Sequence, residues 1–308
     1  DLVRSRGLGD VYKRQVEIEL DYNAFKNKDW SVSVGANATF VKNKIKNLPA
    51  TMKENGYISG SKKWLEGKSI YEFWLRQWHG VDPQTGDGLY VADVSKYNQG
   101  NIGTGDGNIT QSQFDEYKKT VVTIDGKELT NSYTYAKYDF SGSSIPDVYG
   151  GFNVRVSYKN FDLAAVFSYQ LGGQILDTNY ATMMSMTEFG YAQSPDLLKA
   201  WKQAGDITEV PRIDNSAAHT TNIGQSYSTR WLTSSDYLNL RSVTIGYQLP
   251  KTWLSKVMLK SARLNLTAEN LFMLKARQGL NPMANYSGVT YNEYMPSRNI
   301  TLGLNVSF

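Results

Sequence analysis

The chain lacks cysteine and has only two histidines among its 308 residues. The absence of cysteine excludes disulfides, thiolate zinc sites and cysteine nucleophiles. No apolar run approaches the roughly 18 residues of a membrane-spanning helix, so a helical membrane protein is excluded. Basic and acidic residues are interspersed and nearly balanced, 33 Lys and Arg against 29 Asp and Glu, which argues against nucleic acid as a partner.

Tyrosine, tryptophan and glycine are abundant, with 21 Tyr, 7 Trp and 26 Gly. Tyr and Trp each have an apolar body and a polar tip, so this surplus indicates interfaces with membrane, sugar or protein. Residues 1–15 have neither the apolar segment of a signal peptide nor an amphipathic period, and they resemble a translated sequencing-adapter tail. We therefore predict a non-native tail at 1–15 and the C-terminal part of a longer protein at 16–308.

From Val16 onward the dominant pattern is alternation of apolar and polar residues. In one example, Val32, Val34 and Phe40 alternate with Ser33 and other polar or small residues. Successive side chains of a strand point to opposite faces, so such a segment has one apolar and one polar face. The pattern predicts seven strands, at residues 16–22, 30–40, 152–158, 161–169, 237–248, 262–269 and 300–308.

Two architectures fit these strands. In a soluble sandwich the apolar faces meet in a core, whereas in a transmembrane barrel they face lipid and the polar faces line a lumen. Three details favour the barrel: charged or small residues on the polar face, aromatics at the ends of the apolar stripes, and strand lengths near the ~9–11 residues that cross a bilayer. We expect an all-β, antiparallel transmembrane barrel portion.

The connections between the expected strands alternate between short and long. Short ones occupy 25–29, 159–160 and 249–261, and long ones occupy 41–151, 171–236 and 271–298. Outer-membrane barrels have short periplasmic turns and long external loops, whereas a sandwich has no reason to place every long loop at one end. This alternation again favours the barrel.

Several segments then resemble a known family. The most specific is SDYLNLRSVTIGYQLP at 235–250, and the others are EGKSI at 66–70, GVDPQTG at 80–86, PDVYGG at 146–151, YKNFDL at 158–163, NLF at 270–272, YMPSR at 294–298 and GLNVSF at 303–308. Their order and spacing resemble the C-terminal part of SusC/RagA-type TonB-dependent outer-membrane receptors of Bacteroidetes. The resemblance covers nearly everything after Gln15.

The resemblance implies a 22-strand barrel in the outer membrane, in contact with its lipid, and a plug and TonB contact in an N-terminal part absent from this sequence. It also implies a SusD-like surface lipoprotein as partner and import of oligosaccharides or peptides. No enzymatic activity, cofactor or metal follows from it. The alternative hypotheses are a secreted β-rich adhesin or glycan-binding module and, more remotely, a glycoside hydrolase.

An aromatic-rich stretch within the first long connection is the candidate for contact with a glycan, a peptide or a partner protein. Sugar rings stack on aromatic faces, and Tyr and Trp are also enriched at protein interfaces. The candidates are Tyr57, Trp64, Trp74, Trp78 and Tyr90, with Tyr71 in the same stretch.

Other residues that could carry chemistry have plainer interpretations. We interpret His79 and His219 as solvated or packing histidines, since no ligand spacing surrounds them. Gly103, Gly105 and Gly107 fail the calcium-loop spacing and indicate an ordinary external loop. Glu17, Glu19 and Asp21 share one strand face, and we interpret them as lumen wall rather than as glycosidase acids. Ser194 and Pro195 begin a predicted short surface helix that ends near Gly205.

The last strand and the strand parity give two further expectations. Leu304, Val306 and Phe308 form an apolar stripe with a terminal aromatic residue, which resembles the signal that the outer-membrane insertion machinery recognises. If the last strand ends in the periplasm, antiparallel neighbours place 41–151, 171–236 and 271–298 outside the cell. The apolar segment 70–78 is then not a membrane strand, because its residues do not keep a period of two.

Overall fold

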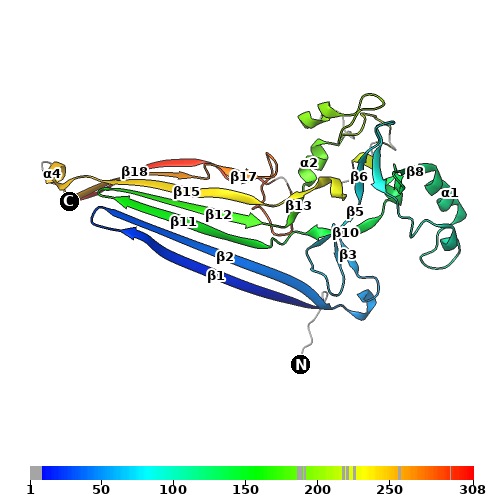
Figure 1. Ribbon diagram of the computed structural model, residues 1–308, viewed down its shortest axis with the longest axis horizontal. Coiled ribbons are helices and arrows are strands. Elements are labelled where there is room, and N and C mark those ends of the chain that lie inside the picture. The colour runs from blue at the N-terminus through cyan, green and yellow to red at the C-terminus, as the bar shows by residue number, and fades with distance from the viewer. Residues whose placement is uncertain are drawn as a thin grey trace.

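The computed structural model describes residues 9–185, 190, 192–216, 219, 222–224, 227–255, 258–291 and 293–308. Its main feature is one large antiparallel sheet of long strands, with smaller sheets and helices gathered at one end (Figure 1). Among the described residues, none of the helices is both long and apolar enough to cross a membrane.

The large sheet contains all seven strands that the alternation predicted. Their order follows the chain, and each is antiparallel to its neighbours. The strands are β1 (Asp10–Lys26), β2 (Trp30–Asn47), β11 (Val148–Tyr158), β12 (Phe161–Leu171), β15 (Tyr237–Gln248), β16 (Ser261–Glu269) and β18 (Asn299–Ser307), and the short β17 (Met273–Lys275) pairs with β15. The soluble sandwich is therefore wrong, since the strands form one sheet rather than two facing ones.

The short connections lie at one end of this sheet, together with the C-terminus and helix α4 (Lys251–Leu254) (Figure 1). The turn after β1 is fixed by Asn27, whose side-chain oxygen accepts hydrogen bonds from the backbone N–H of Asp29 and Trp30, at 2.9 and 2.7 Å. Lys159 has φ of 50° in the two-residue turn before β12. These local contacts hold neighbouring strands in register.

The long connections lie together at the other end, and we call residues 48–147, 172–236 and 270–298 the loop region. Its sheets join β3 (Tyr57–Ser59), β4 (Lys62–Trp64), β5 (Glu72–Arg76) and β10 (Tyr138–Ser143); β6 (Trp78–Val81), β7 (Gly88–Val91), β8 (Val121–Ile124) and β9 (Lys127–Thr130); and β13 (Gln174–Leu176) with β14 (Leu232–Ser234). Its α-helices include α1 (Gln111–Thr120) and α2 (Thr178–Met183). Its 3₁₀ helices are Ala50–Met52, Gln99–Asn101, Tyr133–Tyr135, Pro195–Lys199 and Thr229–Trp231.

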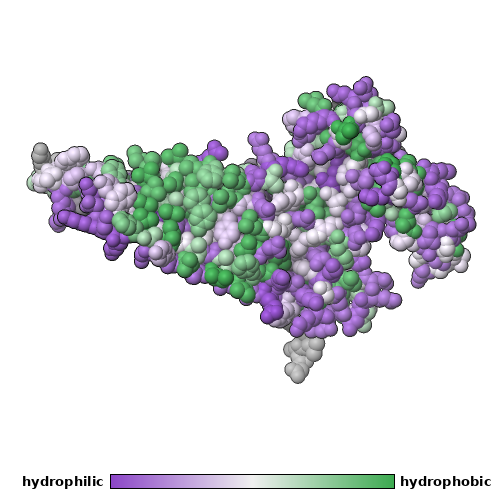
Figure 2. All heavy atoms as spheres, in the orientation of Figure 1, coloured by the Kyte–Doolittle hydropathy of each residue, from purple (hydrophilic) through white to green (hydrophobic). Residues whose placement is uncertain are grey.

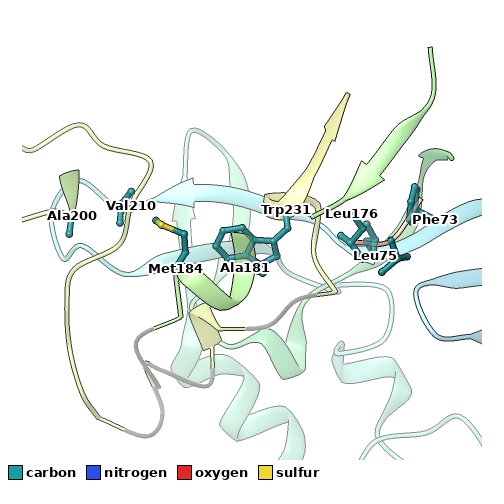
Figure 3. Close-up of a cluster of buried hydrophobic side chains, with 9 residues drawn as sticks. Phe73, Leu75, Leu176, Ala181, Met184, Ala200, Val210 and Trp231 are labelled. Atoms are coloured by element: carbon teal, nitrogen blue, oxygen red, sulfur yellow. The ribbon is translucent and has the colours of Figure 1, made fainter. Parts of the chain in front are cut away.

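The loop region has its own hydrophobic cores. The larger core takes Phe73 and Leu75 from the first long connection, Leu176 and Trp231 from the second, and Val289 from the third (Figure 3). A second core lies within the first connection alone, where Tyr117 of α1 packs with Tyr97 and Tyr135. Burial of large side chains from separate connections makes the loop region a packed unit rather than three independent loops.

The segment 70–78 is confirmed to lie outside the large sheet. β5 occupies its centre, and its Phe73 and Leu75 enter the larger core of the loop region. β5 pairs with β4 and β10 rather than with any strand of the large sheet. The prediction for residues 194–205 needs a correction, because only Pro195–Lys199 is helical, and it is a 3₁₀ helix. The chain then extends so that Ala200 enters the core and Trp201 donates its indole N–H to Pro83 O at 2.9 Å.

Strand limits also differ from those predicted. β1 begins at Asp10, and its residues before Val16 pair with the end of β2. This pairing does not test whether residues 1–15 are native, which stays a prediction. β2 continues to Asn47 instead of ending at Phe40, because its last residues rest on the loop region, where Ile45 accepts a backbone hydrogen bond from Gly67.

Candidate membrane-facing and loop surfaces

The register places every apolar stripe on the same face of the large sheet. Val34 lies opposite Tyr22 on β1 and Val154 on β11. Across the sheet, Leu264 lies opposite Tyr247 on β15 and Leu304 on β18. Directly opposed residues of antiparallel strands share a face, so these side chains form one continuous surface, which we call the apolar band.

The apolar band is exposed to an unusual degree. Leu20, Leu302 and Leu304 are 65%, 74% and 61% exposed, although they belong to regular strands. Figure 2 shows the band as a hydrophobic belt across the strands, with hydrophilic surface over the loop region. Contiguous apolar surface of this kind on a regular sheet indicates contact with lipid or protein.

Aromatic residues lie near both limits of the band. Near the short turns, the ring centroids of Trp30 and Tyr158 are 4.3 Å apart, as are those of Phe161 and Tyr247. Towards the loop region, Phe40 ends the band on β2, and Tyr169 lies 6.5 Å from Phe152 between their ring centroids. Paired aromatic rims are the expected anchors at the two interfaces of a bilayer.

β2 shows where the band ends. Its side chains Val34, Ala36, Ala38 and Phe40 lie on the band face, and the same face continues with Lys42, Lys44 and Lys46. On the opposite face the strand becomes apolar at the same point, where Val41 is 5% and Ile45 0% exposed. From Trp30 to Phe40 the strand rises about 33 Å, which at a tilt of about 40° spans close to the ~25 Å apolar belt of outer-membrane barrels.

The other face of the large sheet is polar. Glu17, Glu19 and Asp21 lie on it, opposite Thr39, Asn37 and Gly35. Farther along, Arg263 Nη2 lies 2.6 Å from Asp162 Oδ2 and forms an ion pair across β15. The two side chains meet above Gly246, where a Cβ would lie only 2.2 Å from Arg263 Nη2. A face of charged, amide and hydroxyl groups matches a barrel interior.

The aromatic candidates are distributed over three ring pairs in the loop region. Tyr57 packs on Trp64 at 5.1 Å in the β3–β4 hairpin. Trp74 lies on the other face of the sheet, against Phe140 at 4.9 Å. Trp78 packs on Tyr90 at 5.1 Å in the β6–β7 hairpin.

These five candidates differ in accessibility. Tyr57 is exposed, and Trp64, Trp74 and Trp78 are half-buried, whereas Tyr90 is 0% exposed. Tyr90 donates its hydroxyl hydrogen to Asn222 O at 2.6 Å, and burial raises its pKa to about 12. The buried Tyr90 ring thus packs against the Trp78 ring and holds it in place. Contact of these residues with a ligand or partner stays a prediction.

Basic residues accompany the aromatics around β5. The Lys63 ammonium lies 4.2 Å from the centroid of Trp74, and the Arg76 guanidinium lies 4.1 and 4.4 Å from those of Tyr133 and Tyr138. A cation over the face of an aromatic ring is attracted by that ring, and the attraction is stronger where both groups are partly removed from water. The arrangement orders this face of the sheet.

The structure also shows a cavity that the sequence did not suggest. It has a volume of about 730 Å³ and lies between α2 and residues 277–294. Arg277 connects its two walls, because its guanidinium lies 3.6 Å from the Tyr180 centroid and 3.5 Å from Asp177 Oδ2. The exposed rings of Tyr291 and Tyr294 stand at its rim. Tyr291 and Tyr294 are the nearest signal in the sequence, and their partners in the cavity come from a distant segment.

The two histidines and the glycine-rich turn are the remaining candidates from the sequence. His79 is exposed, and His219 is 7% exposed with Nε2 2.7 Å from Arg212 O. The glycine-rich turn is closed by the backbone N–H of Gly103, which donates to Ile109 O. No group of His, Asp and Glu suited to holding a metal ion occurs among the described residues.

Comparisons with known proteins agree with this geometry. No family model matches the chain. TonB-dependent receptor P3 of Formosa agariphila is 26% identical over 98% of this chain and 29% of its own length. TonB-dependent receptor P39 of the same organism is 24% identical over 98% of this chain and 31% of its own length. Over nearly its whole length the chain is thus similar to proteins named TonB-dependent receptors.

Solved structures show the same fold. The RagAB peptide importer in its closed-closed state has a TM-score of 0.74 at 24% identity, covering 97% of this chain and 30% of that one. The RagAB peptide transporter has a TM-score of 0.73 at 22% identity, covering 97% and 29%. The resemblance to SusC/RagA-type receptors is thus confirmed, and it places the chain in the outer membrane. The chain spans about a third of the length of the relatives that it matches.

Proposed function

We propose that the receptor chain forms a barrel part of an outer-membrane transporter that imports oligosaccharides or peptides with a SusD-like lipoprotein and energy delivered through TonB. One observation carries the proposal: a single sheet is apolar on one face and polar on the other, with all three long connections at the same end. This arrangement suits a wall between lipid and an aqueous path. The names of the relatives and of the RagAB structures support the same role.

In this proposal the polar face contributes to the path of the cargo. Its carboxylates, amides and hydroxyls can exchange hydrogen bonds with a hydrated ligand without a covalent step. The Thr244 and Thr267 hydroxyls, 3.0 Å apart, and the Arg263–Asp162 pair are examples of groups on this face that are already satisfied by one another. A wall of satisfied polar groups offers weak, exchangeable contacts, which suits passage rather than retention.

The loop region is the proposed contact surface for the cargo and the lipoprotein, because loops on a rigid scaffold commonly carry recognition. Tyr57, Trp64, Trp74 and Trp78 are the proposed aromatic contacts, with Tyr90 as the support of Trp78. Leu304, Val306 and Phe308 are the proposed assembly signal. Leu304 and Val306 lie on the band face opposite Leu264 and Ala262, and Phe308 is 81% exposed.

The experiment is uptake by cells that lack the chromosomal receptor and carry the full-length gene. Labelled peptide and oligosaccharide pools are offered separately, with and without the co-encoded lipoprotein. We expect receptor-dependent uptake of one pool, abolished by removal of the proton-motive force. Equal uptake of both pools in cells without the receptor would contradict the proposal.

The aromatic contacts are tested in the same cells. Tyr57→Ala should lower uptake or lipoprotein capture by about fivefold, the loss expected for a ring worth about 1 kcal/mol at an interface. Phe25→Ala is the matched control, since Phe25 is also exposed but lies near the short turns. Equal effects of the two substitutions would remove Tyr57 from the contact surface.

A further inference from the structure

An open apolar groove lies on the band face next to the loop region. Its volume is about 580 Å³, within the roughly 300–1,000 Å³ of small-molecule sites. Phe152, Tyr169, Leu171, Leu238 and Leu274 provide its apolar wall. The lining surface is almost wholly apolar, in contrast to the mixed cavity beside α2.

The strand register explains why a groove forms at this point. Tyr169 lies opposite Leu238, and Leu238 lies opposite Leu274 on β17, so the three side chains share the band face. Arg241 is an extra residue in the pairing of β15 with β12, and Asn270 has φ of 51° where the chain leaves β16. A bulge bends its strand, and here the neighbour of β15 changes from β16 to the short β17 beyond it.

The groove is continuous with the apolar band. Phe152 belongs both to the groove and to the band, where it lies opposite Ala36 and stacks on Phe167. Leu171 and Leu274 remain 51% and 61% exposed at its wall. Asp236 and Lys275 also line it, with the Lys275 ammonium donating to Leu280 O at 2.7 Å, so the apolar wall ends at charged residues. This succession matches a lipid whose chain ends in a polar headgroup at the bilayer surface.

From this geometry we propose that the groove is a specific site for one acyl chain of an outer-leaflet glycolipid. The assignment to the outer leaflet rests on the proposed function, because that function places the loop region outside the cell. An acyl chain satisfies the groove better than a peptide does, because a peptide backbone brings N–H and C=O groups that the lining cannot bond. The lipid held there would seal the barrel wall where β15 changes its neighbour.

The test uses the full-length receptor in detergent, incubated with deuterated lipid A or with deuterated phosphatidylethanolamine and then washed. Native mass spectrometry counts the retained lipids. Leu274→Trp fills the groove, and Leu302→Trp is the matched control, because Leu302 is 74% exposed on the same band but lies outside the groove. We expect the wild type and Leu302→Trp to retain lipid A, and Leu274→Trp to retain about tenfold less.

Photocrosslinking in living cells gives a second measurement that does not depend on a folded variant in detergent. Benzophenylalanine in place of Leu274 should crosslink to lipid A more than the same group in place of Leu302. Equal retention by both Trp variants, or equal retention of the two lipids by the wild type, would overturn the site. Leu274 lies on the band face opposite Leu238 and is not one of the proposed aromatic contacts, so cargo uptake should be unchanged in Leu274→Trp. Loss of the lipid site and failure of the proposed transport are therefore distinguishable.

Discussion

Gly150 shows how a single residue adjusts the sheet. It lies opposite Tyr169 on the band face, and Tyr169 donates its hydroxyl hydrogen to Asn37 O at 3.0 Å. A Cβ on Gly150 would lie 2.1 Å from that same oxygen. The glycine is required for close approach of β11 to β2, and the tyrosine occupies the space that a side chain would otherwise fill.

Gly150→Ala should therefore destabilise the barrel by about 1–3 kcal/mol, as overpacking does in close-packed regions. Gly303→Ala is the control, since its Cβ would lie 3.9 Å from the nearest atom. The measurement is the temperature at which the full-length receptor loses its folded mobility on electrophoresis. A shift of the same size in both variants would contradict the role of Gly150.

Lys62 is a buried cation in the loop region. It is 9% exposed, its Nζ donates to Tyr71 O at 2.8 Å, and it lies 3.1 Å from the Phe73 centroid. Burial lowers the pKa of Lys62 to about 7 from an ordinary value of 10.5. Between these two values the unfolded chain holds a proton that the folded chain does not hold, so stability rises with pH.

The loop region should consequently resist urea better at pH 9 than at pH 7, by at most about 1.4 kcal/mol per pH unit. Below pH 7 both states are protonated and the dependence should disappear. Lys62→Met should flatten the profile, whereas Lys63→Met should preserve it. Tryptophan fluorescence in urea at the two pH values measures this, and a profile unaffected by Lys62→Met would refute the assignment.

At the scale of elements, the long connections fold as one unit because they share a core. Trp231 is 2% exposed and its ring lies 5.9 Å from that of Tyr180 on α2. In Figure 3 its ring lies between Met184 and Leu176. Removal of such a ring leaves a cavity that several elements cannot fill together.

Trp231→Ala should cost about 3–5 kcal/mol within the loop region and leave the large sheet folded. Limited proteolysis of the full-length receptor should then cut the loop region at lower protease concentration, while the folded mobility of the barrel is retained. Trp253→Ala, at an exposed ring in α4 near the short turns, is the control. Simultaneous loss of the barrel would show that the two parts are not separate in stability.

β18 carries the proposed assembly signal, since Leu304 and Val306 lie on the band and Phe308 follows the strand. Deletion of Phe308 should lower the amount of folded receptor in the outer membrane several-fold, whereas Phe308→Tyr should restore most of it. The amount is measured by immunoblot of outer-membrane fractions. Normal assembly after the deletion would remove the signal role and leave Phe308 as a residue of the aromatic rim.

The sequence predicted the seven strands because each has one side on the apolar band and the other on the polar face, so apolar and polar residues alternate along it. It missed the start of β1 because residues 1–15 were interpreted as a non-native tail. It missed the end of β2 because beyond Phe40 the apolar residues change face, where Val41 and Ile45 are buried. The Arg277 cavity was missed for a related reason. Its partners Asp177 and Tyr180 are about 100 residues away, and no local period reports such a meeting.

At the scale of the whole molecule, the three long connections lie at one end of the sheet and the short turns at the other (Figure 1). This confirms the alternation of strand directions. β1 and β18 form the two edges of the sheet, and no further strand pairs with either among the described residues. Long open edges favour pairing with further strands, which fits a wall segment of a larger barrel.

The most direct test is the accessibility of single cysteines in the full-length receptor on intact cells. Lys96→Cys and Lys127→Cys lie in the loop region, and Lys28→Cys lies in the short turn between β1 and β2. With a membrane-impermeant maleimide, the account predicts labelling at 96 and 127 on intact cells, and labelling at 28 only after the outer membrane is permeabilised. Labelling at 28 on intact cells, or protection of 96 and 127, would contradict it.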